Sequence, residues 1–146
     1  MPRESDQCFT PEWIFKSMRI KFDLDVASPI GGVPWIPAKR SLSHIDNGLK
    51  TEWKGRVWMN PPFSDPALWA KKFTAHGNGV ALLAFSKSKA FDVIWASDAL
   101  IVALPARLKF VKEGKNHAIF MPCFLAAHGD VCKRAIRRVG VSRCCY

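Results

Sequence analysis

Two consecutive prolines interrupt an apolar segment in the middle of the chain. Residues 56–59 read Arg-Val-Trp-Met, a pattern typical of a buried strand, and Asn60, Pro61, Pro62 and Phe63 follow directly. Two prolines cannot continue a hydrogen-bonded ladder, because each lacks a backbone N–H and has a fixed φ, so the strand must end at Asn60. The sequence therefore predicts a side-chain amide, a rigid backbone and an aromatic ring at the end of a buried strand.

Segments with strand and helix patterns alternate along the rest of the chain. The runs 80–85 and 100–104 are apolar without strict alternation, which predicts buried strands covered on both faces. Helices are expected from Pro11 to Met18 with Thr10 as the cap, from Pro66 onward, over 90–97 and from Asp130 to about Gly140. Further strands are expected over 21–27, near 43–45, and over 118–127 as one strand or a pair. This order predicts an α/β sandwich with a mostly parallel central sheet, which binds ligands beyond the carboxyl ends of its strands.

The composition indicates a folded and strongly basic protein. The chain has 146 residues, of which 49% are hydrophobic, so we expect a single domain over residues 1–146 with no separate target-recognition domain. Its 22 Lys and Arg against 12 Asp and Glu give a formal net charge of +10. Residues 1–60 hold 9 basic and 7 acidic residues, and residues 61–146 hold 13 and 5. This excess favours a polyanionic partner, although it also suits a protein kept soluble by its charge.

The cysteines and the hydropathy pattern argue against disulfides, a metal site and a membrane span. The five cysteines are odd in number and irregularly spaced, which indicates thiols in a reducing compartment. Only the adjacent Cys144 and Cys145 and a scattered His128 approach a zinc pattern, so no metal is expected. No apolar run reaches the ~20 residues of a membrane helix. We expect a cytoplasmic protein.

The segment from Asn60 to Phe63 can form a cup for a planar amine. The Asn60 side-chain oxygen and the Pro61 carbonyl can each accept one N–H hydrogen bond, and the Phe63 ring can stack on a base. An exocyclic amine on adenine is a poor nucleophile because its lone pair is delocalised into the ring. Two acceptors aimed at its hydrogens favour the pyramidal form that attacks. The structural alternative is a proline-stiffened turn with Phe63 packed in the core.

Five elements along the chain form a recognisable set. They are Asp6 with Phe9-Thr10-Pro11, residues 22–28, Asp46-Asn47-Gly48-Leu49 with Trp53, residues 57–64 with Trp69, and residues 107–110. In this order they resemble the phage-type DNA adenine-N6 methyltransferases, which use S-adenosylmethionine. The resemblance covers most of the chain and implies a Rossmann-like S-adenosylmethionine-dependent methyltransferase fold. It also implies that Asn60, Pro61, Pro62 and Phe63 are the catalytic motif that holds the target base.

The resemblance also implies where the cofactor binds. Asp25 matches the acidic position that ends the first strand of the cofactor site, where a carboxylate can accept from the methionyl ammonium. Thr10 and Pro11 match the element near the methionine end of the cofactor. Asp46 could bind the ribose hydroxyls, although an exposed Asp-Asn-Gly turn explains this residue equally well. The loop over 28–32 departs from a regular Gly-x-Gly pattern.

Basic residues in the second part of the chain are candidates for DNA contacts. Arg107 and Lys109 belong to a segment that could contact DNA or form a wall of the active site; the alternative is a solvated basic turn with its apolar residues, Leu108 and Phe110, buried. On the last predicted helix, Arg134, Arg137 and Arg138 suit phosphate contacts without base readout, or else form a solvated helix face.

These observations predict methyl transfer from S-adenosylmethionine to adenine N6 in DNA. The target adenine must leave the duplex, because N6 is hidden in the base pair. The resemblance suggests a phage enzyme that protects DNA from restriction. Two alternatives stay open: a methyltransferase of glutamine amides on proteins, which present a similar planar group, and a catalytically silent DNA-binding module of the same fold. The recognition sequence and the oligomeric state do not follow from the sequence.

Overall fold

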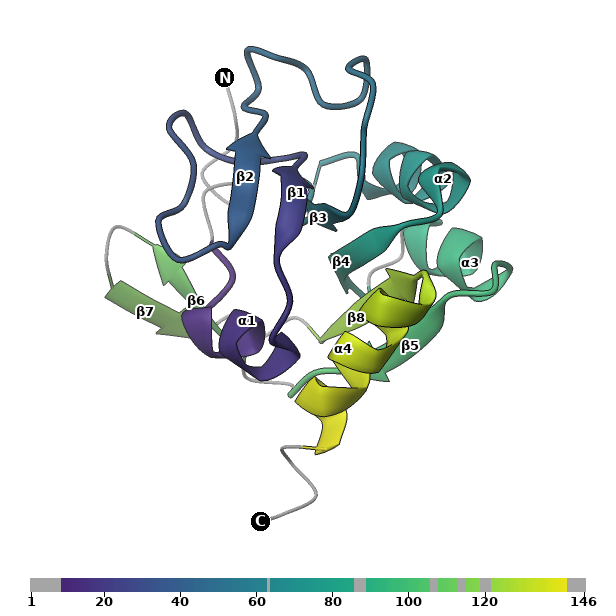
Figure 1. Ribbon diagram of the computed structural model, residues 1–146. Helices are drawn as coiled ribbons and strands as arrows, with labels where there is room; N and C mark the ends of the chain where they lie inside the picture. Colours follow the sequence, from purple (N-terminus) through teal and green to yellow (C-terminus); the bar gives the residue numbers. More distant parts are fainter. Residues whose placement is uncertain are drawn as a thin grey trace.

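A six-stranded sheet with helices on both faces forms the centre of the molecule (Figure 1). The computed structural model describes residues 9–62, 64–85, 89–105, 108–112, 115–118 and 122–141. The strand order is β2-β1-β3-β4-β8-β5, with β1 Phe22–Asp25, β2 Ala38–Ser41, β3 Val57–Met59, β4 Gly79–Ala84, β5 Leu100–Ala103 and β8 Cys123–His128. The helices are α1 Glu12–Met18, α2 Pro66–His76, α3 Ala90–Trp95 and α4 Asp130–Val141, and β6 Lys109–Lys112 with β7 Lys115–Ala118 forms a separate hairpin.

The sheet is mixed but mostly parallel. β1 pairs in parallel with β2 and with β3, and β3 pairs in parallel with β4. β8 runs antiparallel to both of its neighbours, β4 and β5, so β5 points in the same direction as the first four strands. The predicted α/β class with a mostly parallel sheet is confirmed, and the arrangement is compatible with a Rossmann-like fold.

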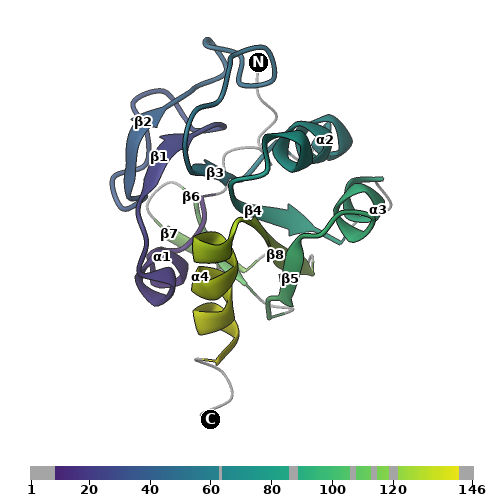
Figure 2. The same cartoon turned by 45° about the vertical axis from the view of Figure 1, so that its right-hand side comes forward.

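Two apolar cores cover the two faces of this sheet. α1 and α4 pack on one face, and α2 and α3 pack on the other (Figure 2). Along β4, Val80 and Leu82 belong to the first core, whereas Ala81 and Leu83 belong to the second. This division explains why β4 reads as a continuous apolar run, because both of its faces are buried.

β3 ends where the proline pair begins, as the sequence predicts. All three of its residues are buried, and Asn60 follows Met59 directly. Asp25, the last residue of β1, lies opposite Trp58 in the register of the two parallel strands. The loops that follow β1 and β3 therefore meet at the same carboxyl edge of the sheet.

One expected strand is wrong in position, and another expected segment contains parts of two strands. The strand near 43–45 is absent; these residues form a turn, and the strand of this region is β2, a polar edge strand. The segment 118–127, expected as one strand or a pair, contains the last residue of β7 at position 118 and β8 from Cys123 onward, and residues 119–121 lie outside the described part of the chain. Periodicity reveals neither β2 nor the hairpin, because β2 has no apolar face and the hairpin stands outside the main sheet.

Two further expectations are wrong in their environment. β5 is predicted to be buried on both faces, but it is half-buried because it forms the edge of the sheet. Thr10 is predicted to cap the first helix, but Pro11 holds the N-cap position of α1 and no side chain caps it. Thr10 therefore has another role. No helix in the described ranges is long and apolar enough to span a membrane.

Candidate active site

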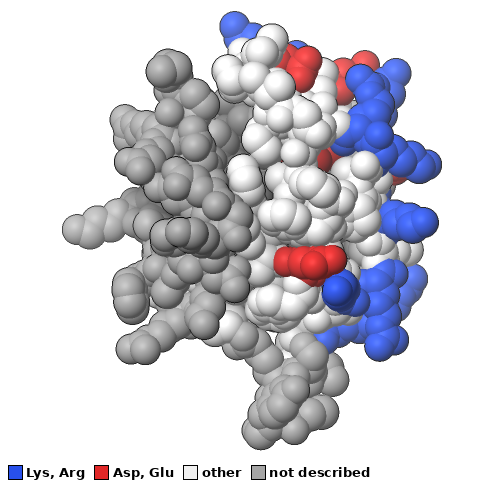
Figure 3. Space-filling model, turned by 90° about the vertical axis from the view of Figure 1, so that its left-hand side faces the viewer, with Lys and Arg blue, Asp and Glu red and all other residues white. Residues whose placement is uncertain are grey.

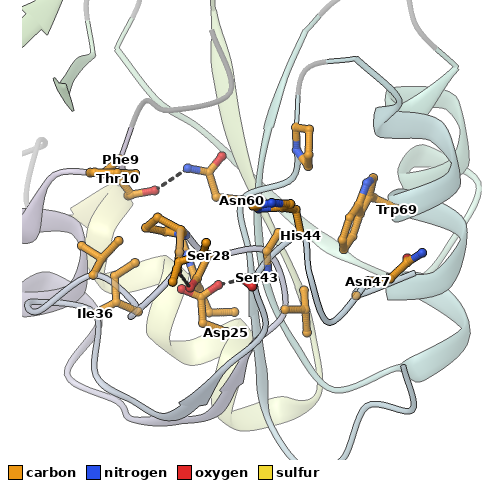
Figure 4. A pocket seen from close by; sticks show the side chains of 18 residues that line it. Phe9, Thr10, Asp25, Ser28, Ile36, Ser43, His44, Asn47, Asn60 and Trp69 are labelled. Carbon is orange, nitrogen blue, oxygen red and sulfur yellow. Dashed lines mark hydrogen bonds between the residues drawn. The ribbon is translucent and has the colours of Figure 1, made fainter. Parts of the chain in front are cut away.

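A pocket of about 640 Å³ opens at the carboxyl edge of β1 and β3 (Figure 4). This volume falls in the usual range for sites that bind small organic ligands. The loops after β1, β2 and β3, the segment before α1 and one residue of α2 contribute its walls, which include Phe9, Thr10, Asp25, Ser28, Ile36, Ser43, His44, Asn47, Asn60, Pro62 and Trp69. The pocket thus brings together three of the predicted site elements, those of Thr10, Asp25 and Asn60.

Asp25 is a buried carboxylate on the wall of this pocket. Its residue is 2% exposed, and burial raises the pKa of its carboxyl group to about 7, even though the Ala27 N–H donates to Oδ1 at 3.3 Å and lowers it. A charged carboxylate in such surroundings is costly unless a cation or further donors compensate it. Within the described part of the chain no basic side chain forms an ion pair with Asp25, so a cationic group entering the pocket would supply the missing charge.

Asn60 and Thr10 meet across the pocket wall. The Asn60 Nδ2 group donates to Thr10 Oγ1 at 3.0 Å, and Figure 4 shows the two side chains pointing toward each other. Thr10 is completely buried. The predicted amide therefore stands at the carboxyl edge of β3, and a residue 50 positions earlier in the chain contacts it.

The rest of the proline motif lies partly in the pocket. Pro62 lines it, whereas Pro61 is buried and is not among the lining residues. Phe63 lies outside the described residues. The Trp58 side chain also lines the pocket, and its buried indole N–H has no hydrogen-bond partner among the described residues.

The loop after β1 forms one side of the pocket with Ser28, Pro29 and Ile30. Gly31 and Gly32 follow with φ of 84° and 77°, in the left-handed region that favours glycine. The sequence departs here from a regular Gly-x-Gly pattern, and the two glycines turn the chain between Ile30 and the next lining residues, Val33 and Ile36.

The loop after β2 forms the opposite side with Ser43, His44, Asn47 and Gly48. Asp46 belongs to the same loop but is not among the lining residues. Its carboxylate accepts hydrogen bonds from the Ser43 N–H at 2.8 Å and the Ser43 hydroxyl at 3.3 Å, which closes the turn. Ser43 and His44 are pocket residues that sequence reasoning missed, because the strand before them was placed incorrectly.

Close packing fixes this second loop against α2. A Cβ at Gly48 would lie 2.2 Å from the Val26 carbonyl oxygen and 2.8 Å from the Trp69 ring, so only glycine fits. The Trp69 ring, also on the pocket wall, stacks on Trp53 with ring centroids 6.3 Å apart. Lys72 donates to three carbonyls of the loop and lies over the Trp53 ring. Trp69 belongs to the sequence resemblance, but no role follows for it from the sequence alone.

The basic residues expected to contact DNA have different environments. Arg134 and Arg137 are exposed on α4. Arg138 is half-buried, and its Nε and Nη2 atoms donate to the Met18 carbonyl at 3.0 and 2.6 Å, so it ties α4 to α1. Lys109 lies in β6, and Arg107 lies outside the described residues. Figure 3 shows Lys and Arg side chains gathered along one side of the molecule.

The apolar residues on either side of Lys109 are buried: Leu108 is 2% exposed and Phe110 is completely buried. This burial is what the alternative interpretation of the segment, a basic turn with its apolar residues in the core, requires.

Among the described residues, no group of three or more His, Cys, Asp or Glu side chains could hold a metal ion. Cys123 and Cys132 are buried, and burial raises the pKa of both thiols.

Comparisons with known proteins complete this description. The comparison with curated proteins and the comparison with solved structures gave no match. The model of one protein family, described as DNA N-6-adenine-methyltransferase (Dam), matches residues 2–120, which include every described residue of the proline motif and of the β1 loop. The chain therefore belongs to the DNA N-6-adenine-methyltransferase (Dam) family, and this membership implies that it methylates adenine at N6 in DNA.

Proposed function

We propose that this chain transfers a methyl group from S-adenosylmethionine to N6 of an adenine that has been rotated out of duplex DNA. The observation that carries the proposal is that the Asn60 amide and the buried Asp25 carboxylate line one pocket, at the ends of two paired parallel strands. The first group suits an exocyclic amine and the second suits a cation, so the pocket has one group for each reactant.

The described residues fit S-adenosylmethionine, which supplies a methyl group bound to a positively charged sulfonium and also carries an α-ammonium. Asp25 offers the ammonium a carboxylate that lacks a countercharge among the described residues. We expected Asp46 to bind the ribose, but its carboxylate closes a turn with Ser43. Polar groups of Ser43, His44 and Asn47 line the pocket at this side and are better placed to bind the ribose hydroxyls.

Asn60 and Pro61 would bind the adenine amine. The amide oxygen and the Pro61 carbonyl accept its two N–H groups, which localises the nitrogen lone pair for attack on the methyl carbon. The displacement needs alignment rather than a covalent enzyme intermediate. Phe63 completes the site in this proposal by stacking on the rotated base, which offsets part of the stacking lost from the duplex.

DNA docking is assigned to the basic residues of the second part of the chain. Arg134 and Arg137 are exposed and suit phosphate contacts, with Arg107 and Lys109 on the segment around β6. Arg138 lies on the same helix as Arg134 and Arg137, but its guanidinium donates to the Met18 carbonyl. We therefore expect Arg138 to stabilise the fold rather than to contact DNA. In this proposal the chain is one methyltransferase domain that acts in the cytoplasm of a phage host and protects DNA from restriction.

Incubation with tritiated S-adenosylmethionine and unmethylated plasmid DNA tests the proposal. We expect label in DNA, recovered as N6-methyladenine after hydrolysis, and at least a 100-fold loss with Asn60→Ala. Asn78→Ala is the matched control, because it also removes a side-chain amide, but one that lies just before β4, at the amino ends of the parallel strands and away from the pocket. Label in protein glutamine, or DNA binding without label, would contradict the proposal and support one of the two alternatives.

A further inference from the structure

We propose that the Thr10 hydroxyl is a positioning group for the methyl transfer, because it holds the plane of the Asn60 amide. This inference rests on the proposed function and assigns Thr10 a role beyond contact with the cofactor. The structure connects the two side chains directly, with Asn60 Nδ2 donating to Thr10 Oγ1 at 3.0 Å (Figure 4).

The bond matters because the two ends of a side-chain amide have opposite hydrogen-bonding characters. The nitrogen donates and the oxygen accepts, and the group is planar. With Nδ2 toward Thr10, the oxygen lies on the other side of the group. An Asn60 amide rotated by 180° about its last bond would present N–H groups to an amine that itself needs acceptors. Holding one orientation therefore raises the fraction of molecules that can activate the base.

Thr10 can hold the amide because its own position is fixed on both sides. The Trp35 indole N–H donates to the Thr10 carbonyl at 2.8 Å. The preceding residue, Phe9, exchanges two backbone hydrogen bonds with Val111 of β6, at 2.8 and 2.9 Å. Thr10 is completely buried, so its hydroxyl has no competing bulk water. A hydroxyl held by two separate elements can transmit their rigidity to the Asn60 side chain.

This role explains an otherwise unexpected feature of the first helix. Threonine followed by proline is the pattern of an N-cap and a first helical residue, but here Pro11 holds the N-cap position, Thr10 lies one residue before it, and α1 has no side-chain cap. The Thr10 hydroxyl bonds to Asn60 instead, although a helix without a cap is less stable. A stabilising contact is thus replaced by a contact with the residue on which the proposed chemistry depends.

Positioning and cofactor contact predict different kinetics for Thr10→Val, which keeps the shape and removes the hydroxyl. If Thr10 positions Asn60, kcat falls about 10- to 100-fold while the Kd for S-adenosylmethionine, measured by calorimetry, changes less than twofold. Thr10→Ser should restore kcat to within threefold. Thr74→Val is the matched control, because the buried Thr74 hydroxyl has no hydrogen-bond partner among the described residues.

A double-mutant cycle shows whether Thr10 acts through Asn60. In the Asn60→Ala background, single-turnover methylation should be no slower with Thr10→Val than without it, to within twofold. Thr10→Ala repeats the cycle should the valine variant melt at a lower temperature than the wild type. The positioning role would be overturned if Thr10→Val and Thr10→Ala both kept the wild-type kcat, or if their loss lay in the Kd for the cofactor. It would also be overturned if the losses of Thr10→Val and Asn60→Ala multiplied in the double variant. Failure of the wild-type protein to methylate DNA would instead overturn the proposed function, and this inference with it.

Discussion

Asp25 lies opposite Trp58 in the parallel pairing of β1 with β3, two residues before Asn60. The buried carboxylate at the end of β1 and the amide that directly follows β3 are therefore brought to one edge by the register of two neighbouring strands. A register shift of one residue would turn either side chain to the other face of the sheet. In the proposed reaction, the sheet itself thus sets the separation between the group for the cofactor and the group for the base.

Replacing the buried Asp25 carboxylate should have opposite effects on cofactor binding and on the stability of the ligand-free protein. We expect Asp25→Asn to weaken S-adenosylmethionine binding about 10- to 100-fold, because a charge-assisted interaction with the ammonium is lost. The same variant should melt at a higher temperature than the wild type at pH 8 without ligand, because a buried charge without a partner is removed. Calorimetry and thermal melting measure the two effects. Unchanged affinity in Asp25→Asn would falsify the assignment of Asp25 to the cofactor.

The raised pKa of Asp25 predicts a pH dependence with a definite sign. Burial moves this pKa from 3.8 to about 7, so the folded state binds more protons than the unfolded state between these values. The contribution of Asp25 to stability therefore decreases as the pH rises from about 4 to about 7. Binding of a cation needs the charged form, so the Kd for S-adenosylmethionine should rise about tenfold for each pH unit below 7.

Asp23 on the same strand provides the control for this titration. Hydrogen bonds from the Arg56 backbone and Lys39 lower the pKa of Asp23, so its contribution to stability is present above its unfolded pKa and is lost as the pH falls. Asp23 does not line the pocket, and Asp23→Asn should leave the pH profile of cofactor binding unchanged. A profile that flattens in Asp23→Asn and persists in Asp25→Asn would reverse the assignment.

Lys72 should control the rigidity of the loop after β2. Its ammonium donates to the carbonyls of Gly48 and Leu49, each at 2.9 Å, and to that of Thr51. We expect Lys72→Met to lower the free energy of unfolding by about 1–3 kcal/mol, because the partly buried carbonyls lose a charged donor. Hydrogen exchange of the loop amides should accelerate. The exposed Lys71→Met is the control, and equal effects of the two variants would argue against this role.

The arginines of α4 should differ in their effect on DNA binding. For the double variant Arg134→Gln and Arg137→Gln, we expect the slope of log K against log salt to fall by about 1–2, one for each lost phosphate contact. Arg138→Gln should leave this slope unchanged and lower the melting temperature, because it removes the bonds to the Met18 carbonyl. Titrations of a DNA duplex at several salt concentrations distinguish these outcomes. An unchanged slope in the double variant would place the docking surface elsewhere.

The sequence predicts those parts of the fold whose local pattern agrees with their tertiary environment. β3 and β4 are found because strands buried on both faces are apolar throughout, and the end of β3 is found because prolines stop a ladder. The proline signal places Asn60 at the end of β3, and the alternation over residues 21–27 followed by a Gly/Pro loop places Asp25 at the end of a neighbouring strand. The candidate site could therefore be located before its geometry was known.

The sequence fails where a residue's role depends on a distant partner. Thr10 has the local pattern of a helix cap, and nothing nearby in the sequence indicates a bond to Asn60. Asp46 matches a ribose-binding position, and its carboxylate closes a turn with Ser43, which is the alternative that the sequence also offers. β2 has no apolar alternation, because an edge strand beside solvent does not need one.

The composition of β2 has a consequence for association between molecules. β2 forms one end of the sheet and follows Pro37, and its exposed residues include Lys39 and Arg40. An unpaired edge offers backbone donors and acceptors to any strand that approaches it, and charged side chains on a short strand oppose such pairing. The edge next to the pocket can thus stay open to solvent at high protein concentration without recruiting strands from other copies into a growing aggregate.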